Sequence, residues 1–134
     1  MSTLCILKGN EIFAGAIAVA PVTNWRWYDS VYTERYMRTV SENRKGYLDN
    51  SPVYFADRLK GQYLLVHGGA DDNVHPQHTM EMAKKLVMAN KSFDQFIYPN
   101  RDHGLSGENA RLHLYNKMTD FISDVLRPEG NHEN

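Results

Sequence analysis

The sequence has little of several features that would define a protein class at once. It has a single cysteine, Cys5, which excludes an internal disulfide framework and leaves the redox compartment open. Its longest apolar stretch, Ala14–Val22, is about half of the ~20 residues that a membrane-spanning helix needs, so no membrane span is expected. The first ten residues have no basic region ahead of an apolar segment, so we do not expect a secretory signal peptide.

Neither sign of charge is in excess. Fifteen Lys and Arg against sixteen Asp and Glu give a net charge of −1, which argues against a nucleic-acid partner because that partner would need a basic surface. The 42% of hydrophobic and 23% of charged residues are typical of a globular protein. No repeat or Pro/Gly/Ser-rich linker divides the chain, so we expect one domain over residues 1–127 and a polar tail at 128–134.

Short apolar segments that are flanked by glycine or proline indicate buried β-strands. They lie at residues 14–20, 63–67 and 93–98. Helices are expected at residues 2–7, 30–37, 78–90 and 109–126. In the last of these helices the apolar positions at spacings of three and four are Leu112, Tyr115, Met118, Phe121, Ile122 and Val125. The alternation of strands and helices predicts an α/β fold, with a mostly parallel sheet flanked by helices. Three strands make a thin sheet, which suggests the C-terminal portion of a larger domain.

Polar loops follow the second and third predicted strands. The loop 68–76 carries Asp71 and Asp72 directly after two glycines, and the loop 99–105 carries His103 before a glycine. Ligands and catalytic groups of parallel sheets lie beyond the carboxyl ends of the strands. An Asp followed thirty-two residues later by a His fits the last two members of a Ser…Asp…His triad in α/β-hydrolase order. The alternative is structural, with the acids capping the next helix and the histidine lying in an ordinary turn.

A second chemical interpretation is a metal site. Its ligands would be His67, Asp71, His75 and His78. It is disfavoured because one of these histidines ends a strand while two lead into a helix, so they do not share an obvious focus. Metal analysis of the purified protein would decide between the two interpretations.

A triad nucleophile is not evident in the sequence. The elbow motif G-x-S-x-G occurs nowhere in the chain. Ser2 has no flanking glycines, and Ser106 follows the candidate histidine, which contradicts the expected chain order. Cys5 lies in a predicted helix, where a buried cysteine is usually an inert small hydrophobe.

Three motifs are specific enough to indicate a family. They are WRWYDSVYTERYM at 25–37, HGGADDNVH at 67–75 and DHG at 102–104. Together they resemble the C-terminal catalytic domain of dipeptidyl peptidase IV and its bacterial relatives, within the prolyl oligopeptidase family of serine peptidases. The resemblance covers about residues 2–126, and its first motif is highly specific, whereas DHG alone would be weak.

The resemblance implies a role for each matching residue. Asp71 would be the triad aspartate and His103 the triad histidine. Asn73 would help to bind the carbonyl of the residue that precedes the penultimate proline or alanine. The pocket for that proline or alanine would be formed by Val22, Trp25, Tyr28, Tyr32 and Val74. Aromatic and aliphatic walls suit a pyrrolidine ring, which fills a slot without offering an N–H. No cofactor and no metal are implied.

The same resemblance implies a serine exopeptidase that releases N-terminal Xaa-Pro or Xaa-Ala dipeptides through an acyl-enzyme. The serine segment, the tyrosine of the oxyanion hole and the amine-binding propeller of the family are not matched, so we expect the chain alone to be inactive and the missing N-terminal part to be its partner. We also expect a homodimer, an unpaired edge on the strand at 14–20 and, by analogy with bacterial relatives, an extracytoplasmic parent protein. The alternatives are a non-catalytic α/β-hydrolase-like interaction module and another peptidase of the same family.

Overall fold

The computed structural model describes residues 1–9 and 12–127. A three-stranded parallel sheet forms its centre. The strands are β1 (Gly15–Val19), β2 (Gln62–Gly68) and β3 (Asp94–Tyr98), in the spatial order β1-β2-β3. Ile17 is level with Leu64, and Val66 is level with Phe96. The three predicted strands are therefore present, and each begins and ends within one residue of its predicted bounds. The predicted polar tail at 128–134 lies outside the described residues.

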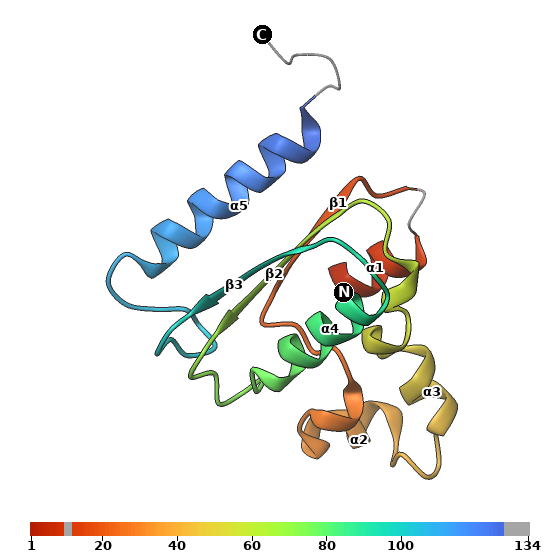
Figure 1. The fold of residues 1–134 in the computed structure, drawn as a ribbon. Helices are drawn as coiled ribbons and strands as arrows, with labels where there is room; N and C mark the ends of the chain where they lie inside the picture. Colours follow the sequence, from red (N-terminus) through yellow and green to blue (C-terminus); the bar gives the residue numbers. More distant parts are fainter. Residues whose placement is uncertain (10–11, 128–134) are drawn as a thin grey trace, which may run out of the picture.

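Within residues 1–9 and 12–127, five α-helices and three short 3-10 helices flank the sheet. The α-helices are α1 (Ser2–Lys8), α2 (Ser30–Met37), α3 (Arg44–Asp49), α4 (Gln77–Met88) and α5 (Ala110–Leu126). The 3-10 helices are Trp25–Trp27, Pro52–Tyr54 and Ala56–Arg58. The sheet lies between α5 on one side and α1 with α4 on the other (Figure 1). In the described residues no helix is both long and apolar enough to cross a membrane.

The side chains of β2 alternate between two separate cores, as the period of a strand requires. Tyr63 and Leu65 belong to the core beneath α1 and α4, where Met82 has no solvent exposure. Leu64 and Val66 belong to the core beneath α5. The central strand is thus covered on both faces, which accounts for its nearly continuous run of apolar residues.

Only some of the apolar positions expected along α5 are buried. Leu112 and Tyr115 are each 62% exposed and Ile122 is 48% exposed, whereas Leu114 is buried. The buried positions of this helix are Ala110, Leu114 and Phe121, with Met118 and Val125 partly buried against them. Spacings of three and four fit more than one stripe on an apolar helix, and the sheet covers only one of them.

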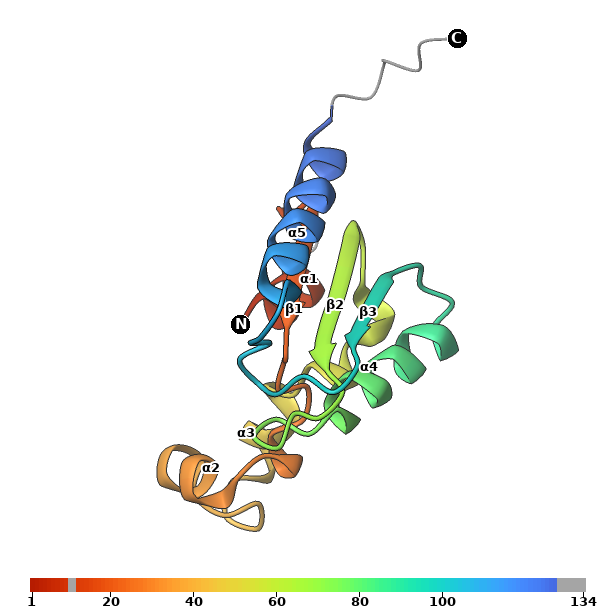
Figure 2. The same cartoon turned by 90° about the vertical axis from the view of Figure 1, so that its left-hand side faces the viewer.

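In the described residues, β1 forms ladder pairs with β2 alone, so its other edge is open. An apolar hollow of about 490 Å³ lies along this edge and α5. Figure 2 shows α5 running beside β1. The unpaired, apolar edge that the resemblance implies is therefore present.

Candidate active site

The loops that follow β2 and β3 meet at the carboxyl edge of the sheet. Gly69 donates its N–H to the carbonyl of Tyr98 at 2.8 Å, and Ala70 donates to the carbonyl of Arg101 at 3.0 Å. A Cβ at Gly68 would collide with the carbonyl oxygens of Arg101 and Asp102. Only glycine permits this approach, so the strand-ending glycine of the sequence motif sets the separation of the two loops.

Asp71 lies at the centre of the site and is only 2% exposed. Its Oδ1 accepts the N–H of Asn73 at 3.0 Å and that of Val74 at 2.9 Å, and its Oδ2 lies 2.8 Å from His103 Nδ1. Burial opposes ionisation of this carboxyl, but the hydrogen bonds from His103, Val74 and Asn73 together hold its pKa below the ordinary value. Asp71 is therefore the carboxylate that faces the imidazole.

The helix-capping alternative for the two acids does not fit the structure. α4 begins at Gln77 behind the N-cap residue Pro76, and the side chain that accepts the N–H of Gln77 is that of His75. Asp71 instead closes a tight turn over Asn73 and Val74. Asp72 is exposed.

His103 lies on the exposed side of the pair, with 43% of its side chain accessible to solvent. A carboxylate only accepts hydrogen bonds, so Nδ1 of His103 carries the proton that it shares with Asp71. In the neutral ring Nε2 then holds a lone pair and can accept a proton from a nucleophile. Arg111 donates to the carbonyl of Gly104 at 3.4 Å and helps to hold the turn of this loop.

The four residues of the alternative metal site do not offer their ligand atoms to one point. Both ring nitrogens of His67 are engaged, with Thr79 Oγ1 at 2.7 Å and with the carbonyl of Val74 at 2.7 Å. Nδ1 of His78 accepts the N–H of Thr23, and Nδ1 of His75 accepts that of Gln77. Within residues 1–9 and 12–127 no group of three or more His, Cys, Asp or Glu side chains could hold a metal ion.

Burial governs the two histidines behind the site. It lowers the pKa of His67, against opposing effects from Val74 and Asp71, and it lowers the pKa of His78 to about 4. Both imidazoles are therefore neutral near neutral pH.

Three aromatic side chains from the loop after β1 and from α2 form a wall beside the pair. Trp25 stacks on Tyr32 with ring centroids 6.0 Å apart, and the edge of Tyr28 meets Tyr32 at 5.6 Å. The Asp29 side chain caps α2 by accepting the N–H of Val31 at 2.8 Å, which fixes where the helix begins. The wall is thus set by a loop and a capped helix.

Asn73 links this wall to the Asp71–His103 pair. Its side-chain oxygen accepts a hydrogen bond from the Tyr28 hydroxyl at 3.0 Å, and its backbone N–H donates to Asp71. The amide NH₂ of Asn73 remains the end that can donate to a carbonyl. The structure therefore brings Asn73 and the aromatic residues into one site.

The two valines occupy less prominent places. Val22 is half-buried in the loop after β1, and Val74 is 3% exposed within the Asp71 turn. Neither lines the hollow of about 700 Å³ beside the wall. That hollow is lined by Tyr28, Asp29, Val31, Tyr32, Arg35, Tyr36, Asp72 and Asn73.

Sequence reasoning did not single out Asp29, Arg35 or Tyr36 as site residues. The sequence could have indicated Tyr36, because it lies four residues after Tyr32 in the predicted helix 30–37. In the structure the rings of Tyr32 and Tyr36 lie 5.0 Å apart. The aromatic wall therefore extends one helical turn beyond the pocket residues assigned from the motif.

Comparisons with known proteins agree on one family. The model of the prolyl oligopeptidase family matches residues 1–129. Dipeptidyl peptidase 4 of Bos taurus is 40% identical over 129 residues, and prolyl endopeptidase FAP of Bos taurus is 42% identical over 129 residues; each match covers 94% of this chain and 17% of the relative. The crystal structure of Porphyromonas gingivalis dipeptidyl peptidase 4 matches with a TM-score of 0.89 and 48% identity, over 91% of this chain and 17% of that one.

These matches define both the fold and its extent. The solved relatives have an α/β-hydrolase fold, and the parallel sheet with flanking helices described above is part of it. The chain spans about a sixth of the length of the relatives it matches. The chain belongs to the prolyl oligopeptidase family of peptidases.

Proposed function

We propose that the chain is part of a serine exopeptidase that releases Xaa-Pro or Xaa-Ala dipeptides from peptide N-termini. The observation that carries this proposal is the 2.8 Å contact between Asp71 Oδ2 and His103 Nδ1, across two loops at the carboxyl edge of a parallel sheet. The order of the two residues in the chain is that of an α/β-hydrolase triad. The names of the matched relatives, such as dipeptidyl peptidase 4, support the dipeptidyl specificity.

In this proposal the aromatic wall receives the penultimate residue of the peptide. Trp25, Tyr28 and Tyr32 present ring faces and edges to the compact pyrrolidine ring. Val22 and Val74 would complete the pocket from the loops after β1 and β2. The Asn73 amide donates to the carbonyl of the preceding residue. The wall binds the substrate while the pair acts on the following peptide bond.

The proposed chemistry needs a serine from outside this chain. His103 Nε2 takes the Oγ proton as the serine attacks the carbonyl carbon, and then gives that proton to the leaving amine as the peptide bond breaks. The dipeptidyl ester is hydrolysed by a water whose proton passes through His103 back to the serine oxygen. Asp71 holds the imidazole in one tautomer and stabilises the imidazolium.

The partner in this proposal is the N-terminal part of the same protein, which would supply the serine, the oxyanion-hole donors and the amine-binding propeller. Removing a triad serine leaves only about 10³–10⁴-fold catalysis over water, from the oxyanion hole and substrate binding. These remaining contributions would also come from the partner. The 134-residue chain alone should therefore show no turnover.

The test compares the chain with a protein extended upstream through a G-x-S-x-G elbow and the propeller. We expect the extended protein to release the chromophore from Gly-Pro and Ala-Pro substrates, and the chain alone to match buffer. The same substrates with an acetylated N-terminus serve as controls, because a dipeptidyl peptidase requires the free amine.

Three outcomes would change the assignment. Cleavage of the acetylated substrates would favour another peptidase of the family, such as an endopeptidase. An inactive but folded extended protein would favour the non-catalytic interaction module. Turnover by the short chain alone would show that its chemistry lies elsewhere.

We also propose that the protein forms a homodimer through α5, as the family resemblance implies. The exposed Leu112, Tyr115 and Ile122 lie on this helix, and the Tyr98 hydroxyl bonds His113 Nδ1 at 2.7 Å beside it. Light scattering should show self-association that Tyr115→Glu weakens. A monomer that persists at all concentrations would contradict this proposal.

A further inference from the structure

His67 lies near the end of β2, behind Asp71, and its side chain has no solvent exposure. Its Nδ1 is 2.7 Å from Thr79 Oγ1 in α4, and its Nε2 is 2.7 Å from the carbonyl oxygen of Val74. The same Nε2 is 3.3 Å from Asp71 Oδ2. Polar groups of Thr79 in α4 and of Val74 and Asp71 in the loop after β2 therefore surround one buried imidazole.

The partners of His67 fix its tautomer. A backbone carbonyl only accepts hydrogen bonds, so the proton of the neutral ring must be on Nε2, facing Val74 and Asp71. Nδ1 then accepts the hydroxyl proton of Thr79. In this arrangement every polar atom of the ring is satisfied, as a buried ring requires.

We propose that His67 is a positioning residue for the Asp71–His103 pair, an inference that rests on the function proposed above. Its Nε2–H approaches the same carboxylate oxygen that accepts the proton of His103, so Oδ2 lies between two imidazoles. The two backbone N–H groups of Asn73 and Val74 hold the other oxygen. With both oxygens held, the carboxylate cannot rotate away from His103.

The contact with Val74 extends this role to the substrate pocket. The carbonyl of Val74, which His67 contacts, belongs to the turn that carries Asn73. The side-chain oxygen of Asn73 accepts a hydrogen bond from the Tyr28 hydroxyl. His67 thus fixes both the carboxylate of the pair and the turn from which the substrate-binding amide projects.

The first experiment needs no variant. Two-dimensional ¹H–¹⁵N spectra of the histidine rings in the 134-residue chain should show His67 as the Nε2–H tautomer over neutral pH. A predominant Nδ1–H tautomer would overturn the proposal, because Nε2 would then turn a lone pair, and not an N–H, toward the Val74 carbonyl and Asp71.

The second experiment uses two matched substitutions. In His67→Gln the amide NH₂ reaches the position of Nε2, whereas in His67→Asn the amide reaches only the position of Nδ1. Loss of the Nε2–H contact with the Asp71 carboxylate should make the His103 Nδ1 proton exchange with water roughly tenfold faster in His67→Asn, and His67→Gln should restore the slow exchange. Equal exchange rates in both variants would overturn the proposal.

Thr79→Val is the control for a merely structural effect. It removes the hydrogen bond at Nδ1 of His67 and leaves the side that faces Asp71 intact. We expect it to lower the unfolding temperature without changing the exchange of the His103 proton. Acceleration as large as in His67→Asn would show that His67 acts only through the general stability of the core.

The kinetic counterpart separates this inference from the proposed function. In the extended protein, His67→Asn should lower kcat roughly tenfold with KM nearly unchanged, and His67→Gln should recover most of the loss. If the extended parent protein has no activity, the proposed function fails, and the nitrogen spectra still decide whether His67 positions Asp71. If the parent is active and the two variants are equally impaired, the positioning role fails alone.

Discussion

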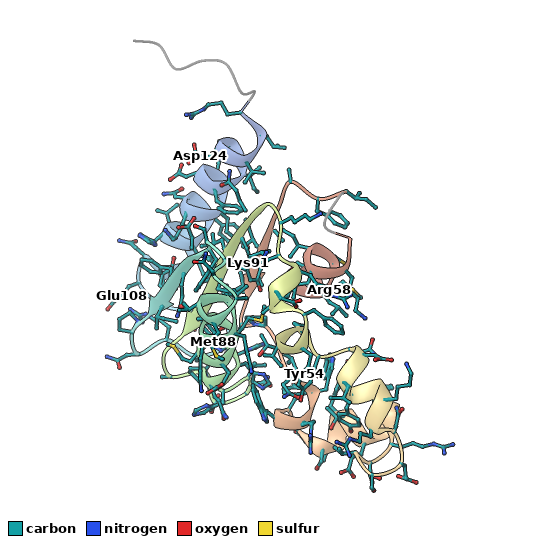
Figure 3. All side chains as sticks on the ribbon, turned by 45° about the vertical axis from the view of Figure 1, so that its right-hand side comes forward. Tyr54, Arg58, Met88, Lys91, Glu108 and Asp124 are labelled. Atoms are coloured by element: carbon teal, nitrogen blue, oxygen red, sulfur yellow. The ribbon has the colours of Figure 1, made fainter. Side chains whose placement is uncertain are left out.

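The two loops that build the candidate site are held in opposite ways. The Asp71 loop is fixed by hydrogen bonds from the backbone N–H groups of Asn73 and Val74 to the buried Asp71 carboxylate, and by the buried His67 imidazole, which bonds the Val74 carbonyl. The His103 loop is exposed and is braced by long surface side chains, with Arg101 Nη2 2.5 Å from Glu108. Figure 3 shows Glu108 at the surface of the molecule beside the start of α5.

The backbone repeats this contrast. In the loop after β3, four residues adopt a positive φ, a region that residues other than glycine rarely enter. These residues are Asn100, Leu105, Gly107 and Glu108. In the loop after β2, no described residue does so. The comparison suggests that the carboxylate is the rigid member of the pair, while the imidazole lies on a loop with a lower cost of local opening.

The largest effect on activity should come from replacing Asp71, the rigid member of the pair. In the extended protein, Asp71→Asn should lower kcat on the order of 10⁴, because the amide would favour the wrong tautomer of His103. Asp72→Asn is the matched comparison, because Asp72 is exposed and lines the hollow beside the wall; its loss should change KM and leave kcat within a factor of about two. Steady-state kinetics of both variants would settle the choice of acid, and a larger loss in Asp72→Asn would reverse it.

Acid should lower the free energy of unfolding through the buried histidines behind the site. Burial lowers the pKa of His78 to about 4, so between pH ~6.5 and ~4 the unfolded chain binds a proton that the folded chain does not. Stability should therefore be complete above pH ~6.5 and fall on acidification by up to about 3 kcal/mol from this group. His67, whose pKa is also lowered by burial, changes stability in the same direction.

The check is the free energy of unfolding as a function of pH, in the parent chain and in His78→Leu. The substitution should flatten the slope between pH ~6.5 and ~4, because it removes the titrating group. An unchanged slope would mean that the folded chain binds a proton at His78 as readily as the unfolded chain does.

The junction between the two loops is the next target. Gly68→Ala should cost about 1–3 kcal/mol, because its Cβ would collide with two backbone carbonyls that cannot move easily. Gly69→Ala is the control, since its nearest atom would be the carbonyl oxygen of Tyr98 at 3.4 Å, an ordinary contact. Urea unfolding would measure both, and equal losses would argue that the close approach is not what selects glycine.

The smallest effect is expected for the exposed ion pair between Arg101 and Glu108. Glu108→Gln should cost less than about 1 kcal/mol, because 83% of the Glu108 side chain is exposed and solvent screens its pairing with Arg101. The loss should shrink further in high salt. A larger, salt-independent loss would show that the His103 loop is held as firmly as the Asp71 loop, which would remove the contrast.

Much of the fold could be predicted from the sequence, for physical reasons. The strand β2 is a run of apolar residues that ends at two glycines, and α2 spans Ser30–Met37 as expected. The helix α3 and the short 3-10 helices were not predicted, because six residues or fewer carry no usable periodicity. The buried face of α5 could not be predicted, because the period alone does not say which apolar stripe the sheet covers.

The candidate site was predictable where chain order and motif carried information. The juxtaposition of Asp71 and His103 follows from two loops at the same edge of a parallel sheet. The contacts of His67 were not predictable, because they depend on the rotamer of a buried ring and on the turn at Val74. The roles assigned to the pair and to the pocket residues remain predictions until activity is measured.

The central claim is that His103 acts as the base for a serine supplied by the rest of the protein. The most direct measurement is fluorophosphonate labelling of the extended protein, which requires an activated serine. His103→Ala should abolish the labelling, whereas His75→Ala, which changes an exposed histidine of the alternative metal site, should leave it intact. Labelling that persists at full rate in His103→Ala would contradict the account.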